Sequence, residues 1–219
     1  MGPGSRRLRV VVTRPAEQGA ELARRVEALG HEAVLCPLIE IEPVGPQVVD
    51  TSGYDWVIVT SPRAARELAR RRRGGLPSVA AIGPGTAAAL REDGIEPALV
   101  PALSTQEGLV AELPRPTGRV LFAGAEDARP YLAEELGADT VVLYRTRLLR
   151  PDTLPEGDLV VLASASAARA YARLGLGLPA VSIGPETTCE ARAQGVEVIR
   201  EAETHDLDGL VAAIAAVRI

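Results

Sequence analysis

The stretch "DWVIVTSPRAARELAR" at residues 55–70 returns as "DLVVLASASAARAYAR" at residues 158–173. Each copy opens on an aspartate, continues through an uninterrupted apolar run, and passes through a short turn into an amphipathic stretch rich in alanine and arginine. An uninterrupted apolar run is typical of a strand that is buried on both faces of a parallel sheet. Each copy therefore predicts a buried parallel strand followed by a helix.

Further repeats surround this pair. They are "AIGPGTAAAL" (81–90) with "SIGPETTCEA" (182–191), "STQEGLVAEL" (104–113) with "THDLDGLVAAI" (204–214), and the opening residues 9–30 with a weaker copy at 119–137. The copies follow one another as A, B, A′, B′, which indicates an internal duplication. Repetition alone leaves two pairings open. A can pack with B in two sequential domains, or B and A′ can form a middle domain while A and B′ form the other.

Short apolar runs alternate with helical patterns along the whole chain, which predicts an α/β fold with parallel sheets covered by helices on both faces. Two extended segments, "CPLIEIEP" (36–43) and "YRTRLLRP" (144–151), lie where A meets B, and they can pair as a two-stranded ribbon. Ten further strands predict two five-stranded sheets, with strands expected at 8–13, 31–36, 55–60, 78–82, 97–101, 119–123, 139–144, 158–163, 180–183 and 196–199.

The composition excludes several kinds of chemistry. All 24 basic residues are arginine, so a Schiff-base lysine, a pyridoxal phosphate enzyme and a Walker lysine are excluded. Two histidines and two distant cysteines argue against a zinc site, and no acidic cluster offers a magnesium site. We expect neither a metal nor an organic cofactor. The absence of asparagine in a chain rich in alanine, arginine, leucine and proline is typical of a thermophile.

The charge and hydropathy pattern limits the partners. A net charge of −5 in 219 residues argues against general nucleic-acid binding, and the arginine run at 70–73 is interpreted as a solvated helix end. No apolar run reaches the length of a membrane span, and the first residues do not resemble a signal peptide. We therefore expect a cytoplasmic protein that binds neither nucleic acid nor membrane.

The segments that follow the predicted strands are rich in glycine, serine, threonine and proline. Ligands of parallel sheets bind at the carboxyl ends of the strands, where helix N-termini present free N–H groups. Each segment alone is an ordinary helix cap, but the repeated set predicts an oxyanion-binding surface in two related copies. The segments are "TRP" (13–15), "TSPRA" (60–64), "IGPGT" (82–86), "AGAED" (123–127), "SASA" (164–167) and "IGPET" (183–187).

Tyr144 is the tyrosine with the most informative position. It ends a predicted strand and opens the crossover "YRTR", whereas Tyr54 precedes a strand and Tyr131 and Tyr171 lie in helical stretches. From position alone, a functional role and a packing role are equally well supported for Tyr144. The three other tyrosines are interpreted as packing residues.

The motifs "VVVTRP", "VIVTSPRA", "AAIGPGTAAAL", "VVLYRT" and "VSIGPETT", in this order, resemble those of the uroporphyrinogen-III synthase family. The resemblance extends from Arg9 to Ile214. It implies two flavodoxin-like lobes, each a five-stranded parallel sheet with helices on both faces, joined by a two-stranded ladder. It implies an outer lobe of residues 1–36 plus 152–219, a ladder of 37–43 and 144–151, and an inner lobe of 44–143, with the active site between the lobes.

The resemblance also implies the reaction. The family cyclises hydroxymethylbilane to uroporphyrinogen III, with inversion of ring D, through a spiro intermediate and with loss of water. It implies a monomer without a metal or cofactor, and a transient encounter with hydroxymethylbilane synthase is expected. An alternative is a non-catalytic two-lobed binding or sensor protein for a small anion.

The same resemblance assigns roles to residues. It implies catalytic roles for Tyr144, Thr86 and Thr187. Two departures from the family pattern are Glu186, where some members have threonine, and "AGAEDARP" (123–130), where Arg129 can replace the arginine of a glycine-rich loop. The substrate-binding residues that it implies are Arg14, Thr60, Ser61, Arg63, Gly83, Gly124, Ser164, Ser166 and Gly184.

Overall fold

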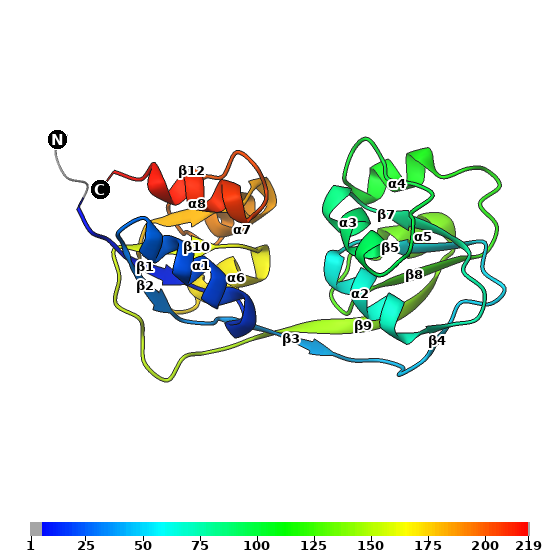
Figure 1. Ribbon diagram of the computed structural model, residues 1–219, viewed down its shortest axis with the longest axis horizontal. Coiled ribbons are helices and arrows are strands. Elements are labelled where there is room, and N and C mark those ends of the chain that lie inside the picture. The colour runs from blue at the N-terminus through cyan, green and yellow to red at the C-terminus, as the bar shows by residue number, and fades with distance from the viewer. Residues whose placement is uncertain (1–5, 219) are drawn as a thin grey trace. The chain divides into compact units, whose positions relative to one another are not determined.

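The computed structural model describes residues 6–218, and the expected outer-lobe segments at residues 1–5 and 219 lie outside it. The described chain divides into two compact units, one made of the residues up to Glu40 together with those from Arg147 onward, the other of Ile41–Thr146. In Figure 1 the first unit combines the blue start of the chain with its yellow-to-red end. Among the described helices, none has the length and apolar character of a membrane span.

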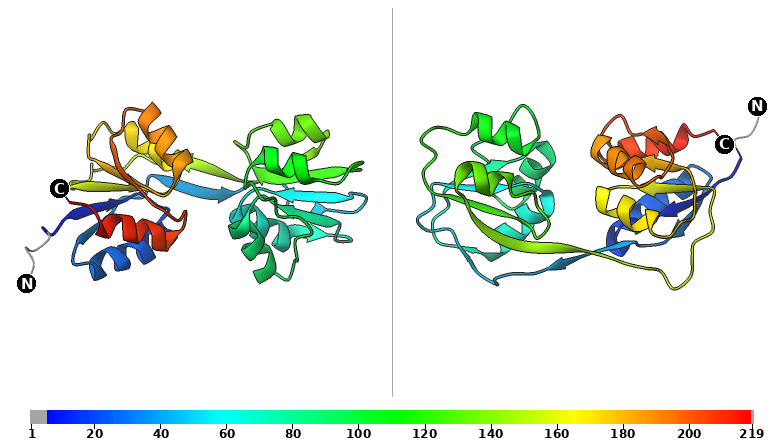
Figure 2. Two further views of the ribbon diagram at one scale, coloured as in Figure 1. Left: turned by 90° about the horizontal axis from the view of Figure 1, so that it is seen from above. Right: turned by 180° about the vertical axis from the view of Figure 1, so that it is seen from behind.

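The first unit is built on a parallel sheet with the strand order β12-β11-β10-β1-β2. Val10 and Val12 of β1 pack against one helix pair, α1 and α8, while Val11 between them packs against the other pair, α6 and α7. Figure 2 shows the two pairs on opposite faces of the sheet. The elements are β1 (Arg9–Val12), α1 (Ala16–Ala28), β2 (Glu32–Leu35), β10 (Leu159–Leu162), α6 (Ala165–Ala172), β11 (Ala180–Ser182), α7 (Pro185–Ala193), β12 (Val198–Glu201) and α8 (Leu207–Ala215).

The second unit has the strand order β3-β9-β8-β5-β7, with β9, β8, β5 and β7 parallel. Its sheet carries α2 and α3 on one face and α4 and α5 on the other. A short parallel pair, β4 with β6, lies outside the sheet. The elements are β3 (Ile39–Pro43), β4 (Val49–Asp50), β5 (Trp56–Val59), α2 (Pro62–Arg71), β6 (Arg72–Arg73), β7 (Ser78–Ala81), α3 (Pro84–Glu92), α4 (Gln106–Glu112), β8 (Val120–Ala125), α5 (Tyr131–Leu136) and β9 (Asp139–Leu148).

The segments β3 and β9 are neighbours in this sheet and run in opposite directions. The Val44 N–H donates to the Leu143 carbonyl at 3.0 Å, and the Leu149 N–H donates to the Leu38 carbonyl at 2.8 Å. The partners' numbers rise on one strand as they fall on the other, which is the antiparallel pattern. The extended segments 36–43 and 144–151 therefore contain strands that pair with each other.

The aspartates that open the two long repeats accept equivalent backbone hydrogen bonds in the two units. Asp55 accepts a hydrogen bond from the backbone N–H of Arg119 at 2.7 Å, and Asp158 accepts one from the backbone N–H of Arg9 at 2.8 Å. In each unit a carboxylate before one strand thus binds the start of the neighbouring strand. The two copies of the sequence repeat therefore share this hydrogen bond between neighbouring strands.

The strand expected at residues 97–101 is reduced to one bridge, between Leu99 and Ala80. Proline lacks an N–H, so Pro97 and Pro101 cannot donate to a ladder, and a proline-flanked segment is limited to the edge of a sheet. The Ala98 N–H still reaches the Val79 carbonyl at 2.8 Å. The fifth strand of this sheet is instead β3, at the opposite edge.

The arginine run at 70–73 is not simply a solvated helix end. The Arg71 side chain is only 2% exposed, and it pairs with the Glu67 carboxylate at 2.7 Å. It also donates to the carbonyls of Val44, at 2.5 Å, and Leu143, at 3.0 Å. Burial alone would raise the pKa of Glu67, but hydrogen bonds from Arg70 and Arg71 outweigh it and hold the pKa below its usual value. Arg71 is therefore a buried link between α2 and the two crossing segments.

We expect Arg71→Met to lower the free energy of unfolding of the protein by about 3–5 kcal/mol, because it removes the buried partner of the Glu67 carboxylate and a charged donor from the Val44 and Leu143 carbonyls. The matched control is Arg70→Gln, since Arg70 also binds Glu67 but is exposed, and a loss of less than about 1 kcal/mol is expected there. Urea unfolding measures both. Equal midpoints for Arg71→Met and the wild type would refute the structural role of Arg71.

The effect of Arg71→Met depends on pH in a defined direction. The folded-state pKa of Glu67 is depressed, so its stabilisation is present above pH 4.5, its ordinary value, and is lost as the pH falls through the lower folded value. We therefore expect the difference in unfolding free energy between the wild type and Arg71→Met to shrink as the pH is lowered from 7 toward about 3. A difference that stays constant over this range would exclude Glu67 as the responsible partner.

Candidate functional site

The connections of the second unit leave β5 and β8 toward opposite faces of the sheet. The helices after β5 and β7 cover one face, and the helices that flank β8 cover the other. Such a reversal is the place where doubly wound sheets bind ligands, at the carboxyl ends of the strands. Thr60, Ser61 and Arg63 follow β5 at this end, and Gly124 lies near the end of β8.

Tyr144 and Ser61 meet at this end of the sheet. The Tyr144 hydroxyl lies 3.0 Å from Ser61 Oγ. Tyr144 belongs to β9 and Ser61 follows β5, so the contact crosses the intervening strand β8. Burial raises the pKa of Tyr144, the Ser61 hydrogen bond lowers it, the Asp127 charge raises it, and the Arg63 charge lowers it, with a net rise. The phenol therefore keeps its proton at neutral pH and can donate a hydrogen bond.

Arg63 brings an unused donor to the same place. Its Nε is buried and has no hydrogen-bond partner within residues 6–218, while its terminal nitrogen lies 3.4 Å from Glu67. A buried donor without an acceptor costs about 1–3 kcal/mol, and charged groups cost more. A ligand oxygen can reach this N–H only if the protein atoms that cover the nitrogen move.

The first Ile-Gly-Pro segment forms the start of α3. Gly83 caps the helix, and a Cβ at this position would lie 2.6 Å from Ser104 Oγ, so the neighbouring loop requires glycine. Thr86 is buried in the first turn. A Cβ on Gly85 would lie 4.0 Å from the Pro62 ring of α2, which places the starts of α2 and α3 next to each other.

Gly124 has a packing reason as well. A Cβ on Gly124 would lie 2.8 Å from the ring of Phe122, and the register of β8 against β9 shifts between Gly124 and Ala125. In the following loop, Arg129 binds both oxygens of Glu107, at 2.8 and 3.1 Å. The guanidinium that was expected to replace a family arginine is therefore directed to α4.

The first unit presents a related set of segments. Ser164 caps α6 by accepting from the Ala167 N–H at 3.1 Å, and Ser166 accepts from Arg169 at 3.2 Å. Arg14 follows β1 and donates to Gln18 at 2.9 Å, and burial lowers the pKa of Arg14. These residues lie at the carboxyl ends of β1 and β10.

The second Ile-Gly-Pro segment forms the start of α7. Gly184 caps the helix, Thr187 is buried in the first turn, and a Cβ on Gly184 would lie 2.8 Å from the His205 ring. Glu186 is exposed in that first turn, where a negative charge suits the helix dipole. Thr188, which is not among the predicted site residues, contacts Ser182 at 2.6 Å and also binds Glu201. The doubled threonine of "IGPETT" was the available signal.

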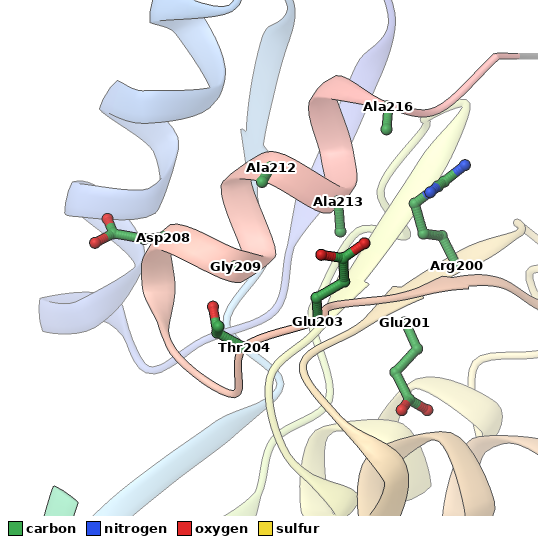
Figure 3. Close-up of a pocket in the computed structure, with 9 residues that line it drawn as sticks. All are labelled: Arg200, Glu201, Glu203, Thr204, Asp208, Gly209, Ala212, Ala213 and Ala216. Carbon is green, nitrogen blue, oxygen red and sulfur yellow. The ribbon is translucent and has the colours of Figure 1, made fainter.

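One cavity of the first unit is lined by residues 200–216. Figure 3 shows a cavity of about 350 Å³ beside α8, where Asp208 points toward α1 and pairs with Arg25. Within residues 6–218, no group of three or more histidine, cysteine or acidic side chains is arranged to bind a metal ion. The cavity contains none of the predicted site residues, and its lining is Arg200, Glu201, Glu203, Thr204, Asp208, Gly209, Ala212, Ala213 and Ala216.

The chain is similar to known proteins over nearly its whole length. A curated uroporphyrinogen-III synthase from Synechococcus elongatus is 26% identical over 94% of this chain and 93% of that protein. The crystal structure of a mutant uroporphyrinogen III synthase from Thermus thermophilus superposes with a TM-score of 0.66 at 21% identity, covering 94% of this chain and 97% of the other. The structure of uroporphyrinogen-III synthetase from Helicobacter pylori has a TM-score of 0.67 at 18% identity, covering 97% and 100%.

These structures share the α/β fold with parallel sheets. The sequence model of one family, described as Uroporphyrinogen-III synthase HemD, matches residues 20–212. The match includes both Ile-Gly-Pro segments and Tyr144. The chain belongs to the uroporphyrinogen-III synthase family.

Proposed function

We propose that this enzyme cyclises hydroxymethylbilane to uroporphyrinogen III, with inversion of ring D and loss of water. Family membership supports the reaction, and it leaves the alternative of a non-catalytic anion-binding protein without support. The observation that carries the proposal in this chain is the protonated phenol of Tyr144, held at the carboxyl end of a parallel sheet beside an unsatisfied arginine N–H.

The chemical step that needs an acid is the cleavage of one C–O bond, at the terminal hydroxymethyl group of the substrate. Hydroxymethylbilane is a linear tetrapyrrole with eight carboxylates, and its pyrroles supply the electrons that expel the terminal hydroxyl. Tyr144 donates its proton to that hydroxyl, the C–O bond breaks, and water departs. The substrate is then an azafulvene cation, and Tyr144 is a phenolate. A neutral phenol suits this step as a hydrogen-bond donor or weak general acid. The proton released when the last pyrrole regains aromaticity returns to the phenolate.

The ring inversion requires positioning. The substituted carbon of ring D attacks the cation and forms a spiro intermediate, which fragments and recloses with ring D reversed. The unassisted bilane closes without inversion, so the protein has to hold the less reactive arrangement near the cation. Holding reacting atoms in place is a large source of catalysis. The carboxylates of the substrate provide the points at which it is held.

Both units contribute binding residues in this proposal. The N-termini of α2, α3, α6 and α7 present N–H groups to substrate carboxylates, and threonine and serine hydroxyls add donors. Thr86 and Thr187, one in each Ile-Gly-Pro segment, are assigned catalytic roles with Tyr144. The residues assigned to substrate binding are Arg14, Thr60, Ser61, Arg63, Gly83, Gly124, Ser164, Ser166 and Gly184.

The strand orders support a further structural interpretation. In the first unit β2-β1-β10-β11-β12 is the 2-1-3-4-5 order of flavodoxin-like sheets. The second unit has the same order, β9-β8-β5-β7 followed by the segment of Leu99, if its strands are counted from β8 rather than from β5. The chain of this unit is thus circularly permuted relative to the flavodoxin-like order. We interpret the chain as two flavodoxin-like lobes joined by the β3–β9 ladder. We further propose a monomer that meets hydroxymethylbilane synthase transiently to receive its unstable substrate.

The activity is tested by supplying hydroxymethylbilane and separating the uroporphyrinogen isomers after oxidation to porphyrins. We expect isomer III to predominate with enzyme and isomer I to predominate in the blank, since spontaneous closure does not invert ring D. A heat-denatured sample serves as the control. Formation of isomer I alone, at the blank rate, would contradict the proposed function.

We expect Tyr144→Phe to lower the turnover to isomer III by about 10²-fold or more, because general acid catalysis typically contributes that much. The fold should survive, since only one hydroxyl is removed. Tyr54→Phe is the matched control, because the Tyr54 phenol also makes a side-chain hydrogen bond, to Asp139 at 2.9 Å, but lies at the opposite end of β5. Unchanged turnover in Tyr144→Phe would remove the phenol from the mechanism.

A further inference from the structure

Ser61 Oγ stands between a helix start and the phenol. It accepts a hydrogen bond from the Ala64 N–H at 3.0 Å, which caps α2, and it lies 3.0 Å from the Tyr144 hydroxyl. A serine hydroxyl offers one proton and two lone pairs. The amide N–H can only donate, so it occupies one lone pair and leaves the serine proton available for a different partner.

Two proton arrangements satisfy the Ser61–Tyr144 contact. In one, Tyr144 donates to Ser61 and its own proton is used. In the other, Ser61 donates to the Tyr144 oxygen, and the phenol proton is free to point at a third group. Only the second arrangement lets Tyr144 act on the leaving hydroxyl while it remains bound to the protein.

The surroundings favour the second arrangement. The N-terminus of a helix carries partial positive charge, and a hydroxyl that accepts from a backbone N–H becomes a stronger donor itself. Ser61 is the N-cap of a ten-residue helix, and the Arg63 charge also acts on Tyr144. Polarisation therefore runs from the helix start through Ser61 to the phenol oxygen.

The duplication supplies a natural comparison. Ser164 caps α6 just as Ser61 caps α2, with 3.1 Å to the Ala167 N–H. The segment "LCPLIEIEP" (35–43) corresponds to "LYRTRLLRP" (143–151), so the position of Tyr144 is taken in the first unit by Cys36. Cys36 is buried in the core that also contains Ala167 of α6. The serine cap is common to both copies, and the phenol is specific to one.

We propose that Ser61 is a positioning residue for Tyr144: it anchors the phenol oxygen and directs the phenol proton toward the departing hydroxyl of the substrate. This inference rests on the proposed function, in which Tyr144 is the proton donor. It replaces a direct substrate-binding role for Ser61, because both the proton and a lone pair of Ser61 are then used within the protein.

The kinetic test compares Ser61→Ala with Tyr144→Phe and with the double variant. We expect Ser61→Ala to lower kcat for isomer III about 10-fold or more with KM changed less than about 3-fold, since the loss falls on the transition state. The double variant should be no slower than Tyr144→Phe, because residues that act as one unit are not additive. Ser61→Thr, which restores a hydroxyl, should recover most of the activity.

A helix cap is lost in Ser61→Ala, and two variants separate that loss from the proposed role. Ser61→Gly removes the hydroxyl at a cost of only a few tenths of a kcal/mol to the helix, and it should have the same low kcat. Thr105→Ala removes the equivalent cap of α4, where Thr105 accepts from the Gly108 N–H at 3.0 Å. It should keep the wild-type kcat.

A second readout is the titration of Tyr144 itself. Phenolate absorbance of the free protein, taken as a difference from Tyr144→Phe, reports the pKa of this phenol. The Ser61 hydrogen bond lowers that pKa, so Ser61→Ala should raise it and Ser61→Thr should restore it. A role for Ser61 in helix capping alone would leave this pKa unchanged.

The outcomes separate the two proposals. Wild-type kcat in both Ser61→Ala and Ser61→Gly, or a change in KM alone, overturns the positioning role while a slow Tyr144→Phe keeps the proposed function. Wild-type kcat in Tyr144→Phe instead overturns the role of Tyr144 and this inference together. Low kcat in both serine variants with no further loss in the double variant supports the positioning role.

Discussion

The second unit depends on one buried guanidinium. Arg71 ends α2, and it binds the Leu143 carbonyl of β9 as well as the Val44 carbonyl that follows β3. Leu143 directly precedes Tyr144, and α2 begins just after Ser61. The Arg71 guanidinium therefore links β9, the strand that carries Tyr144, to α2, the helix whose N-cap is Ser61. Arg71 and the Tyr144–Ser61 contact thus join α2 and β9 at two places.

Much of the fold was predictable because its signals are local. Uninterrupted apolar runs predicted strands buried on both faces, and the repeats predicted two sheets. The signals failed where a distant partner decides the outcome. The apolar segment at 97–101 had the right hydropathy, but its prolines remove the donors that a ladder needs. Arginine is usually exposed, but Arg71 is buried because carbonyls from two segments remote in sequence accept its hydrogen bonds.

The candidate site divides in the same way. Strand ends and helix caps could be placed from sequence, because glycine, serine and proline mark them. The contact between Tyr144 and Ser61 could not, since it joins strands that are not neighbours in the sheet. Arg129 shows the converse, because its position in a site-forming loop gave no sign that Glu107 of another helix would bind it. Sequence patterns locate side chains along the chain, whereas their partners are set by topology.

The correspondence between Tyr144 and Cys36 has a genetic consequence. The codons of cysteine and tyrosine differ at one base. A single point mutation can therefore interconvert the two side chains at this position. A serine-capped helix and parallel strands are present at the corresponding place in both halves. The duplication therefore supplied both halves with the same scaffold, and the two corresponding positions on it now carry different side chains.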